Sequence, residues 1–472
     1  MKFTLISSAL LVVGASAKLH TPSTHVDYVR RALPSDAAGY AKLDNPTKEC
    51  KYYTPPEMEQ MLKERLPKAG KIADILPNDD EAKKVWKEIQ DMGIIPEEVK
   101  TKPDASNGKH AEVDVKSANY DADKDPDCWW SASQCTKPKH NKIPEDIAVC
   151  PEGSTYGLTF DDGPNCSHNA FYDFLKQKKL KASLFYIGTN VATWPYQAQR
   201  GLADGHDICV HTWSHPAMTT LSDSQVFAEL FYTVRVIKAV LGITTTCWRP
   251  PFGDTDDRVR AIAAGLGLRT IHWREDTDDW QMASTGSSKQ VRQNYDKIVD
   301  KASNESPIVL AHELHNDTMS IFIEKESKIA DAYKHVAPIS ACMNVTNPYM
   351  ENQIVYPDFE EYTGGNANYK GLPDMSNMKI NPNVDFSALS LAKMDTGFAP
   401  GGENKKQTDT GSATLSSHSS DDGSKNANGS KDGGRGDKDN SHKENGAIQF
   451  SSLSLWAAVL SSITVTFVAF QV

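Results

Sequence analysis

The chain has 472 residues, of which 24% are charged and 39% hydrophobic, so it can bury one large core and still carry extensions. Its formal net charge is −11 and it has no long basic run, which argues against a nucleic-acid partner. We expect a monomer.

The first residues have the pattern of a signal peptide. Lys2 precedes an apolar run from Leu5 to Val13, and Ala15-Ser-Ala17 follows, which predicts cleavage after Ala17. Residues 1–17 would therefore direct export, and the eight cysteines fit an oxidising compartment in which disulfides persist.

Residues 18–124 are charged, with helix-like patches at Glu57–Leu66 and Asp80–Met92 and no constellation of catalytic residues. We interpret them as an N-terminal extension that supports the rest of the chain. Trp129 and Trp130 follow. Packing against the main domain is the preferred interpretation of this pair, and a sugar-stacking platform is the alternative.

Short apolar runs rich in β-forming residues then alternate with helical patterns, the clearest of which is Ser222–Leu241. This alternation predicts an α/β fold, a distorted or incomplete (β/α) barrel of about seven parallel strands, over residues 125–342 with its core at 150–342. The seven runs are 154–161, 181–187, 206–211, 244–249, 268–275, 307–312 and 335–341.

Cysteine positions suggest two disulfides. Cys150 and Cys342 lie just outside the first and last runs, so pairing would tie the ends of the domain together, and Cys128 with Cys135 could close a short loop. Cys209 and Cys247 lie in apolar runs, and we interpret them as buried thiols.

The last part of the chain has a changing composition. Residues 343–400 are expected to wrap around the barrel, and residues 401–445, rich in Ser, Gly and Asp, form a disordered stalk. The apolar, uncharged run from Leu453 to Val472 follows small residues at Asn445-Gly-Ala447. We predict a glycosylphosphatidylinositol (GPI) anchor at Asn445, with residues 446–472 removed, and a single membrane span as the alternative.

Two groups of polar residues suggest metal chemistry. Asp161 and Asp162 follow an apolar run, and neighbouring side chains of an extended chain point in opposite directions, so one carboxylate can bind a metal while the other acts as a base. His211 and His215 would share one face of a helical turn. With one carboxylate they make a three-ligand divalent metal site.

Five ordered motifs resemble those of the polysaccharide deacetylases, carbohydrate esterase family four, and within that family the fungal GPI-anchored chitin deacetylases. The resemblance covers roughly Cys150 to Cys342. The motifs are Thr159-Phe-Asp-Asp-Gly-Pro164, His211-Thr-Trp-Ser-His215, Arg249-Pro-Pro-Phe252, Asp276-Thr-Asp-Asp-Trp280 and Ile308-Val-Leu-Ala-His312.

The resemblance implies a role for each motif. Asp162, His211 and His215 would hold the metal. The ligand types favour zinc, and Co²⁺ or another divalent ion is an alternative. A site of two histidines and one carboxylate also suits ferrous iron. Asp161 would be the general base and Arg249 its partner. The Phe252 backbone N–H would stabilise the oxyanion.

The remaining roles concern the leaving group and the acetate. His312 would be the general acid, oriented by Asp279. His315 is a second candidate for the acid, but it lies outside the motif register, so His312 is preferred. Trp280 and Leu310 would form the acetate pocket.

These roles predict a secreted enzyme, at the outer face of the plasma membrane and in the fungal cell wall, that deacetylates chitin to chitosan. There are two alternatives. One is a deacetylase of another glycan such as xylan, and the other is a non-catalytic glycan-binding protein of the wall. N-glycosylation is expected at the sequons of Asn165, Asn316, Asn344 and Asn428.

Overall fold

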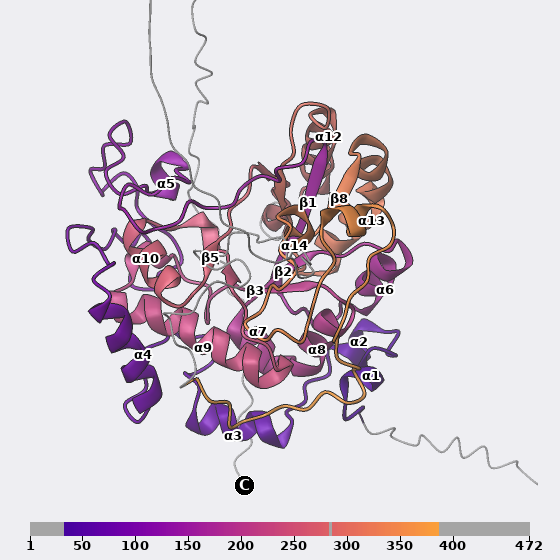
Figure 1. Ribbon diagram of the computed structural model, residues 1–472, viewed down its shortest axis with the longest axis horizontal. Helices are drawn as coiled ribbons and strands as arrows, with labels where there is room; N and C mark the ends of the chain where they lie inside the picture. Colours follow the sequence, from indigo (N-terminus) through magenta and orange to yellow (C-terminus); the bar gives the residue numbers. More distant parts are fainter. Residues whose placement is uncertain (1–32, 283–285, 387–472) are drawn as a thin grey trace, which may run out of the picture. The chain divides into compact units, whose positions relative to one another are not determined.

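The computed structural model describes residues 33–282 and 286–386 (Figure 1), so the predicted signal peptide, stalk, GPI signal, Asn428 and Asn445 lie outside the described residues. Among the described residues, no helix is long and apolar enough to cross a membrane. The strands are β1 Thr155–Gly163, β2 Ser183–Tyr186, β3 Asp207–Val210, β4 Cys247–Trp248, β5 Arg269–Thr270, β6 Glu275–Asp276, β7 Ile308–Leu310 and β8 His335–Ala337.

The strands form one parallel sheet in the order β5-β4-β3-β2-β1-β7-β6, with β8 paired to β1. The expected parallel α/β fold is confirmed. The apolar run 268–275 differs from expectation because it divides into β5 and β6, which are the two ends of the sheet and are not paired. The incoming chain lies there instead, since Ile147 pairs with Ile271 and Val149 with Pro307.

Helices connect the strands and surround the sheet. The helices before β1 are α1 Ala37–Tyr40, α2 Pro46–Glu49, α3 Pro56–Glu64, α4 Asp80–Asp91 and α5 Trp130–Ser133. The later ones are α6 Asn169–Gln177, α7 Gly188–Thr193, α8 Pro195–Ala203, α9 Asp223–Leu241, α10 Asp257–Gly265, α12 Ser288–Asp300, α13 Asn316–Ala332, α14 Ile339–Cys342 and α15 Phe359–Thr363, with 3₁₀ turns η1 Met218–Thr220, η2 Pro251–Gly253 and η3 Asp279–Gln281.

Helix α9 is the central helix, and its ends follow from its sequence. Ser222 and Gln225 form a capping box at the start, and Gly242 adopts φ +76° directly after the last turn, a conformation that glycine accepts without steric cost. Nearly all of α9 is buried because the extension covers the face that the sheet does not, and α4 lies beside it (Figure 1).

The N-terminal extension shares the main core. Met58, Met61 and Val85 belong to the same buried apolar cluster as the strands and α9. On its polar side, Arg235 of α9 pairs with Asp79 and Glu81. The extension is thus an integral layer of the fold within the described residues.

Four disulfides link the described residues. The expected Cys128–Cys135 and Cys150–Cys342 pairs are confirmed. The interpretation of Cys209 and Cys247 as thiols is wrong: the two form a disulfide, because Val210 pairs with Trp248 and this register brings the preceding residues of β3 and β4 side by side. Cys50 pairs with Cys166 and joins the extension to the segment after β1.

Candidate active site

Asp162, His211 and His215 come together at the carboxyl ends of β1 and β3, where parallel barrels build their sites. The Nε2 atoms of His211 and His215 lie 3.5 Å and 3.3 Å from Asp162 Oδ1. Ligand atoms bound tetrahedrally to zinc at about 2.1 Å are about 3.4 Å apart. The spacing of the three side chains therefore fits such an ion.

The local backbone differs from the sequence expectation in two ways. Asp162 lies in a bulge with φ +70°, so Asp161 and Asp162 both reach His211 instead of pointing apart. The two histidines lie on a loop and not on a helical turn. Positive φ angles at Thr212 (+64°) and His215 (+61°) fold this loop and bring the imidazoles within 4.9 Å of each other.

The chemistry of the donors also fits a cation. His211 Nδ1 donates to the Arg249 carbonyl oxygen at 2.8 Å, so Nε2 is the ring nitrogen that faces Asp162. Burial lowers the pKa of His215 to about 4, so its imidazole is neutral. Asp162 Oδ1 is buried without a hydrogen-bond partner, and buried carboxylate oxygens normally have one.

Asp161 lies beside His211 through Oδ2 and pairs with Arg249 through Oδ1. Arg249 Nη1 lies 2.7 Å from Asp161 Oδ1, and both side chains are buried. Arg249 also donates to Thr159 Oγ1, Ile271 O and His272 O, so its guanidinium is fixed in one orientation. This arrangement holds the Asp161 carboxylate in place beside the three metal-ligand candidates.

His312 follows β7 and pairs with Asp279. The distance from His312 Nδ1 to Asp279 Oδ1 is 2.5 Å, and the His312 N–H donates to Asp279 Oδ2 at 2.9 Å. Burial lowers the pKa of His312, but the Asp279 carboxylate raises it by more, to about 10. His312 is thus protonated at neutral pH. His315, the other candidate for the acid, is the residue that caps the start of α13.

The other predicted residues lie around this centre. Phe252 lies in η2 with φ +58°, its ring 4.7 Å from the His215 ring. Leu310 is buried in β7 opposite Asp276 of β6, and Trp280 is partly exposed in η3. Three asparagines of the predicted glycosylation sequons accept hydrogen bonds. Asn165 and Asn316 accept from the Ser167 hydroxyl, and Asn344 accepts from the Phe359 N–H.

Glu229 supports the metal-ligand loop and was not anticipated from the sequence. It is buried in α9 and accepts hydrogen bonds from the Ser214 N–H, the Ser214 hydroxyl and the Ala73 N–H. Only its acidic character within an apolar helical pattern marks it in the sequence. It links the extension to the residue that precedes His215.

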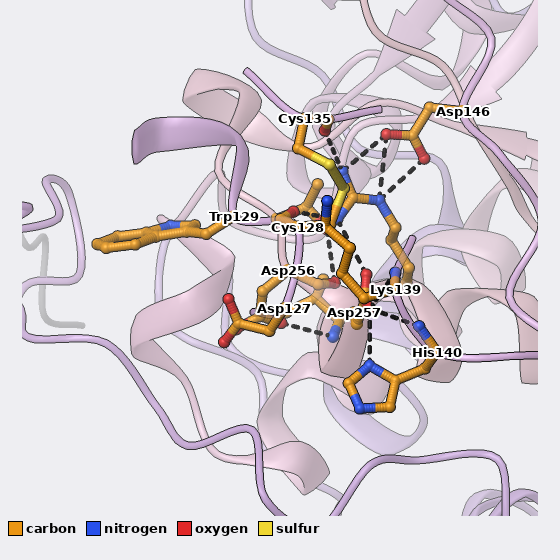
Figure 2. Close-up of polar contacts among 12 residues, drawn as sticks. Asp127, Cys128, Trp129, Cys135, Lys139, His140, Asp146, Asp256 and Asp257 are labelled. Carbon is orange, nitrogen blue, oxygen red and sulfur yellow. Dashed lines mark hydrogen bonds and ion pairs between the residues drawn. A yellow bond between two sulfur atoms is a disulfide. The ribbon is translucent and has the colours of Figure 1, made fainter. Parts of the chain in front are cut away.

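The described residues include one other close group of metal-ligating side-chain types, Asp125, Cys128 and Cys135. Its two sulfur atoms are joined in a disulfide (Figure 2), so they cannot act as thiolate ligands. The group at Asp162 is therefore the one whose donors are available.

Comparison with known proteins decides the family. A family model described as polysaccharide deacetylase matches residues 148–271. The chain is 42% identical over 348 residues to chitin deacetylase 2 of Cryptococcus neoformans var. grubii, covering 72% of this chain and 74% of the relative. The chain belongs to the polysaccharide deacetylase family. It is also 44% identical over 316 residues to the chitin deacetylase of Amylomyces rouxii, covering 65% of this chain and 73% of that protein.

Among solved structures, the chitin deacetylase of Colletotrichum lindemuthianum aligns with a TM-score of 0.39 at 24% identity, over 42% of this chain and 90% of that one.

The family match covers three of the five motifs, those that carry Asp161, Asp162, His211, His215 and Arg249. Membership of the polysaccharide deacetylases therefore agrees with the part of the site where the carboxylates and imidazoles meet.

Proposed function

We propose that the protein is a metal-dependent chitin deacetylase, which hydrolyses N-acetyl groups of N-acetylglucosamine residues to give chitosan and acetate. The observation that carries this proposal is the convergence of Asp162, His211 and His215 between two buried pairs, Asp161–Arg249 and Asp279–His312. The names of the similar fungal proteins support the substrate.

The donor set supports a divalent ion, zinc first, held by Asp162, His211 and His215. When bound, such an ion polarises the amide carbonyl and lowers the pKa of water. Asp161, held in place by its ion pair with Arg249, accepts the proton of the attacking water. The Phe252 backbone N–H donates to the developing oxyanion.

His312 completes the reaction by protonating the leaving amine. Its raised pKa keeps a proton on the ring, and the contact of its Nδ1 with Asp279 leaves Nε2 as the atom that donates. Trp280 and Leu310 enclose the acetate methyl group. One carboxylate thus acts as the base and one imidazole as the acid.

The ends of the chain support a location for this activity. The signal-peptide pattern, the sequons and the apolar tail after Asn445 favour a secreted glycoprotein on a GPI anchor, monomeric, at the outer face of the plasma membrane and in the cell wall. There it would meet chitin as it is laid down.

Acetate release from a chitin oligomer tests the proposal. We expect release by the wild-type protein, loss on chelation, recovery with zinc, and loss in Asp161→Asn but not in the surface control Asp331→Asn. Release of acetate from acetylated xylan but not from chitin would show that the substrate is acetylated xylan and not chitin. No release from either by folded, zinc-loaded protein would favour a glycan-binding protein.

A further inference from the structure

Glu313 is a buried acidic residue that directly follows the candidate acid His312. Its side chain is fully buried, and no step of the proposed reaction involves it. Taking a carboxyl group out of water costs free energy that a leucine or methionine of similar size would not cost. Packing alone therefore does not account for an acidic residue at this position.

The backbone of Glu313 holds the end of the strand that carries the two adjacent carboxylates. Its N–H donates to the Asp161 carbonyl oxygen at 3.0 Å, and the Asp161 N–H donates to the Ala311 carbonyl oxygen at 2.9 Å. These two bonds pair Asp161 with His312 in parallel, just after the end of β7. The residue before Asp162 is thereby fixed to the chain that follows β7.

The side chain of Glu313 contacts the residue on the other side of Asp162. A Cβ atom built on Gly163 would lie 1.6 Å from Glu313 Oε1 and 2.8 Å from a ring carbon of Tyr186. The carboxyl group therefore packs directly on the Gly163 backbone, in space that any other residue would need for its own side chain. The Gly163 carbonyl oxygen also accepts the Ile187 N–H at 2.9 Å.

Asp162 thus lies between two neighbours that Glu313 holds. Its φ of +70° is in the left-handed region, which a residue other than glycine keeps only where the surrounding structure imposes it. Its carbonyl oxygen accepts from Asn190 Nδ2 at 2.8 Å. This conformation of the bulge sets the direction of the Asp162 side chain, whose Oδ1 lies 3.5 Å and 3.3 Å from the Nε2 atoms of His211 and His215.

Buried aromatic side chains keep the Glu313 carboxyl group against Gly163. His168 Nδ1 lies 3.9 Å from Glu313 Oε2, and the His168 ring stacks on the Tyr172 ring with centroids 3.8 Å apart. The Tyr172 hydroxyl in turn bonds the Tyr186 hydroxyl at 3.0 Å. Because all these side chains are buried, the carboxyl group cannot turn away toward solvent.

The size of an oxygen atom explains why a carboxyl group suits this contact. An oxygen atom approaches a Cα–H group to about 3.3 Å, whereas two carbon atoms pack at about 3.5–4.0 Å. A methionine at position 313 would have a similar length, but its carbon and sulfur atoms would push the Gly163 backbone away. A glutamine keeps both the shape of the side chain and an oxygen atom at its end.

We propose that Glu313 is a positioning residue, which fixes the bulge that presents Asp162 to the metal. The inference rests on the proposed function, because the metal belongs to that function. It adds that consecutive residues after β7 serve the two halves of the reaction. His312 protonates the leaving amine, and Glu313 supports the carboxylate that holds the metal.

Zinc titration of the metal-free protein tests this role with Glu313→Ala, Glu313→Met and Glu313→Gln. We expect Glu313→Ala to bind zinc about 10–100-fold more weakly, because groups that orient metal ligands have effects of this size. Glu313→Met, which keeps the volume and stays informative if Glu313→Ala does not fold, should also bind more weakly. Glu313→Gln should bind zinc with close to the wild-type affinity.

The visible spectrum of the Co²⁺-loaded protein is a second readout, since its bands depend on the arrangement of the ligands. It should change in Glu313→Ala and Glu313→Met but not in Glu313→Gln. The matched controls are Glu326→Ala and Glu326→Gln, because Glu326 is a buried glutamate of α13 that pairs with Lys178 just after α6. These controls should lose stability in urea and keep the zinc affinity and the Co²⁺ spectrum of the wild type.

The outcomes separate the two proposals. Wild-type zinc affinity and Co²⁺ spectrum in Glu313→Ala and Glu313→Met would overturn the positioning role and leave the proposed function intact. An equal loss in all three Glu313 variants would overturn it as well, since glutamine preserves the contact with Gly163. Absence of zinc binding by the folded wild type would overturn the metal-dependent function and the positioning role together.

Discussion

Glu229 holds Ser214, the residue just before His215, through two hydrogen bonds of 2.8 Å and 2.7 Å. The same carboxylate accepts the N–H of Ala73 at 2.8 Å. Burial raises the pKa of Glu229 to about 7, so this group is costly to keep inside the fold. The position of a metal-ligand candidate thus depends on a helix and on the N-terminal extension together.

Glu229→Gln should weaken zinc binding by about 10–100-fold, because groups that orient metal ligands have effects of this size. The substitution replaces one acceptor oxygen by an amide that faces an N–H donor. Zinc titration of the metal-free protein measures the change, with Glu88→Gln on the surface of α4 as the control. Equal affinities of variant and wild type would show that Glu229 does not position the loop.

Asp279→Asn should move the alkaline limb of the kcat profile to lower pH. His312 must carry a proton to act as the acid, and Asp279 is the group that raises its pKa to about 10. Without that carboxylate the proton is lost at lower pH, and kcat should also fall by about 10²-fold. A pH–rate profile of both proteins measures this, and an unmoved limb would argue against His312 as the acid.

Arg249→Met should lower the free energy of unfolding by about 3–5 kcal/mol, because it leaves the buried Asp161 carboxylate without its partner. Urea unfolding of the metal-free protein measures the loss. Arg249→Met/Asp161→Asn should recover part of it, since the uncompensated charge is then gone. No recovery would assign the loss to packing and not to the pair.

The double variant Cys50→Ser/Cys166→Ser should be less stable by about 2–5 kcal/mol. This disulfide closes a long loop and ties the extension to the segment after β1. Thermal unfolding without reductant measures the effect. The oxidised wild type is the reference, and a variant as stable as this reference would show that the bond does not hold the extension.

The sequence predicted the strand positions and the polar residues at their ends because apolar runs and turn motifs are local features. Asp161, His211 and Arg249 lie at the carboxyl ends of β1, β3 and β4, so a parallel sheet was enough to bring them to the same edge. Local reasoning was wrong about the backbone at Asp162 and His215. Bulges and positive φ angles are imposed by the neighbouring chain and leave little trace in composition.

Contacts between distant segments were the part that the sequence did not predict. Cys209 and Cys247 face each other only because of the register between β3 and β4. Glu229 contacts Ala73 across 156 positions of sequence, and neither residue lies in a motif. Glu112 and Val113 of the extension likewise line one cavity together with Phe252, and this depends on how the extension folds back on the domain.

Zinc titration followed by acetate release is the measurement that tests the central claim most directly. Zinc is added to metal-free protein with a chitin oligomer as substrate, and the wild type is compared with His215→Ala. The account predicts a rate that rises with zinc and saturates near one ion per chain in the wild type, and a rate that stays at background in the variant. Full activity of the metal-free wild type, or equal zinc responses of the two proteins, would contradict it.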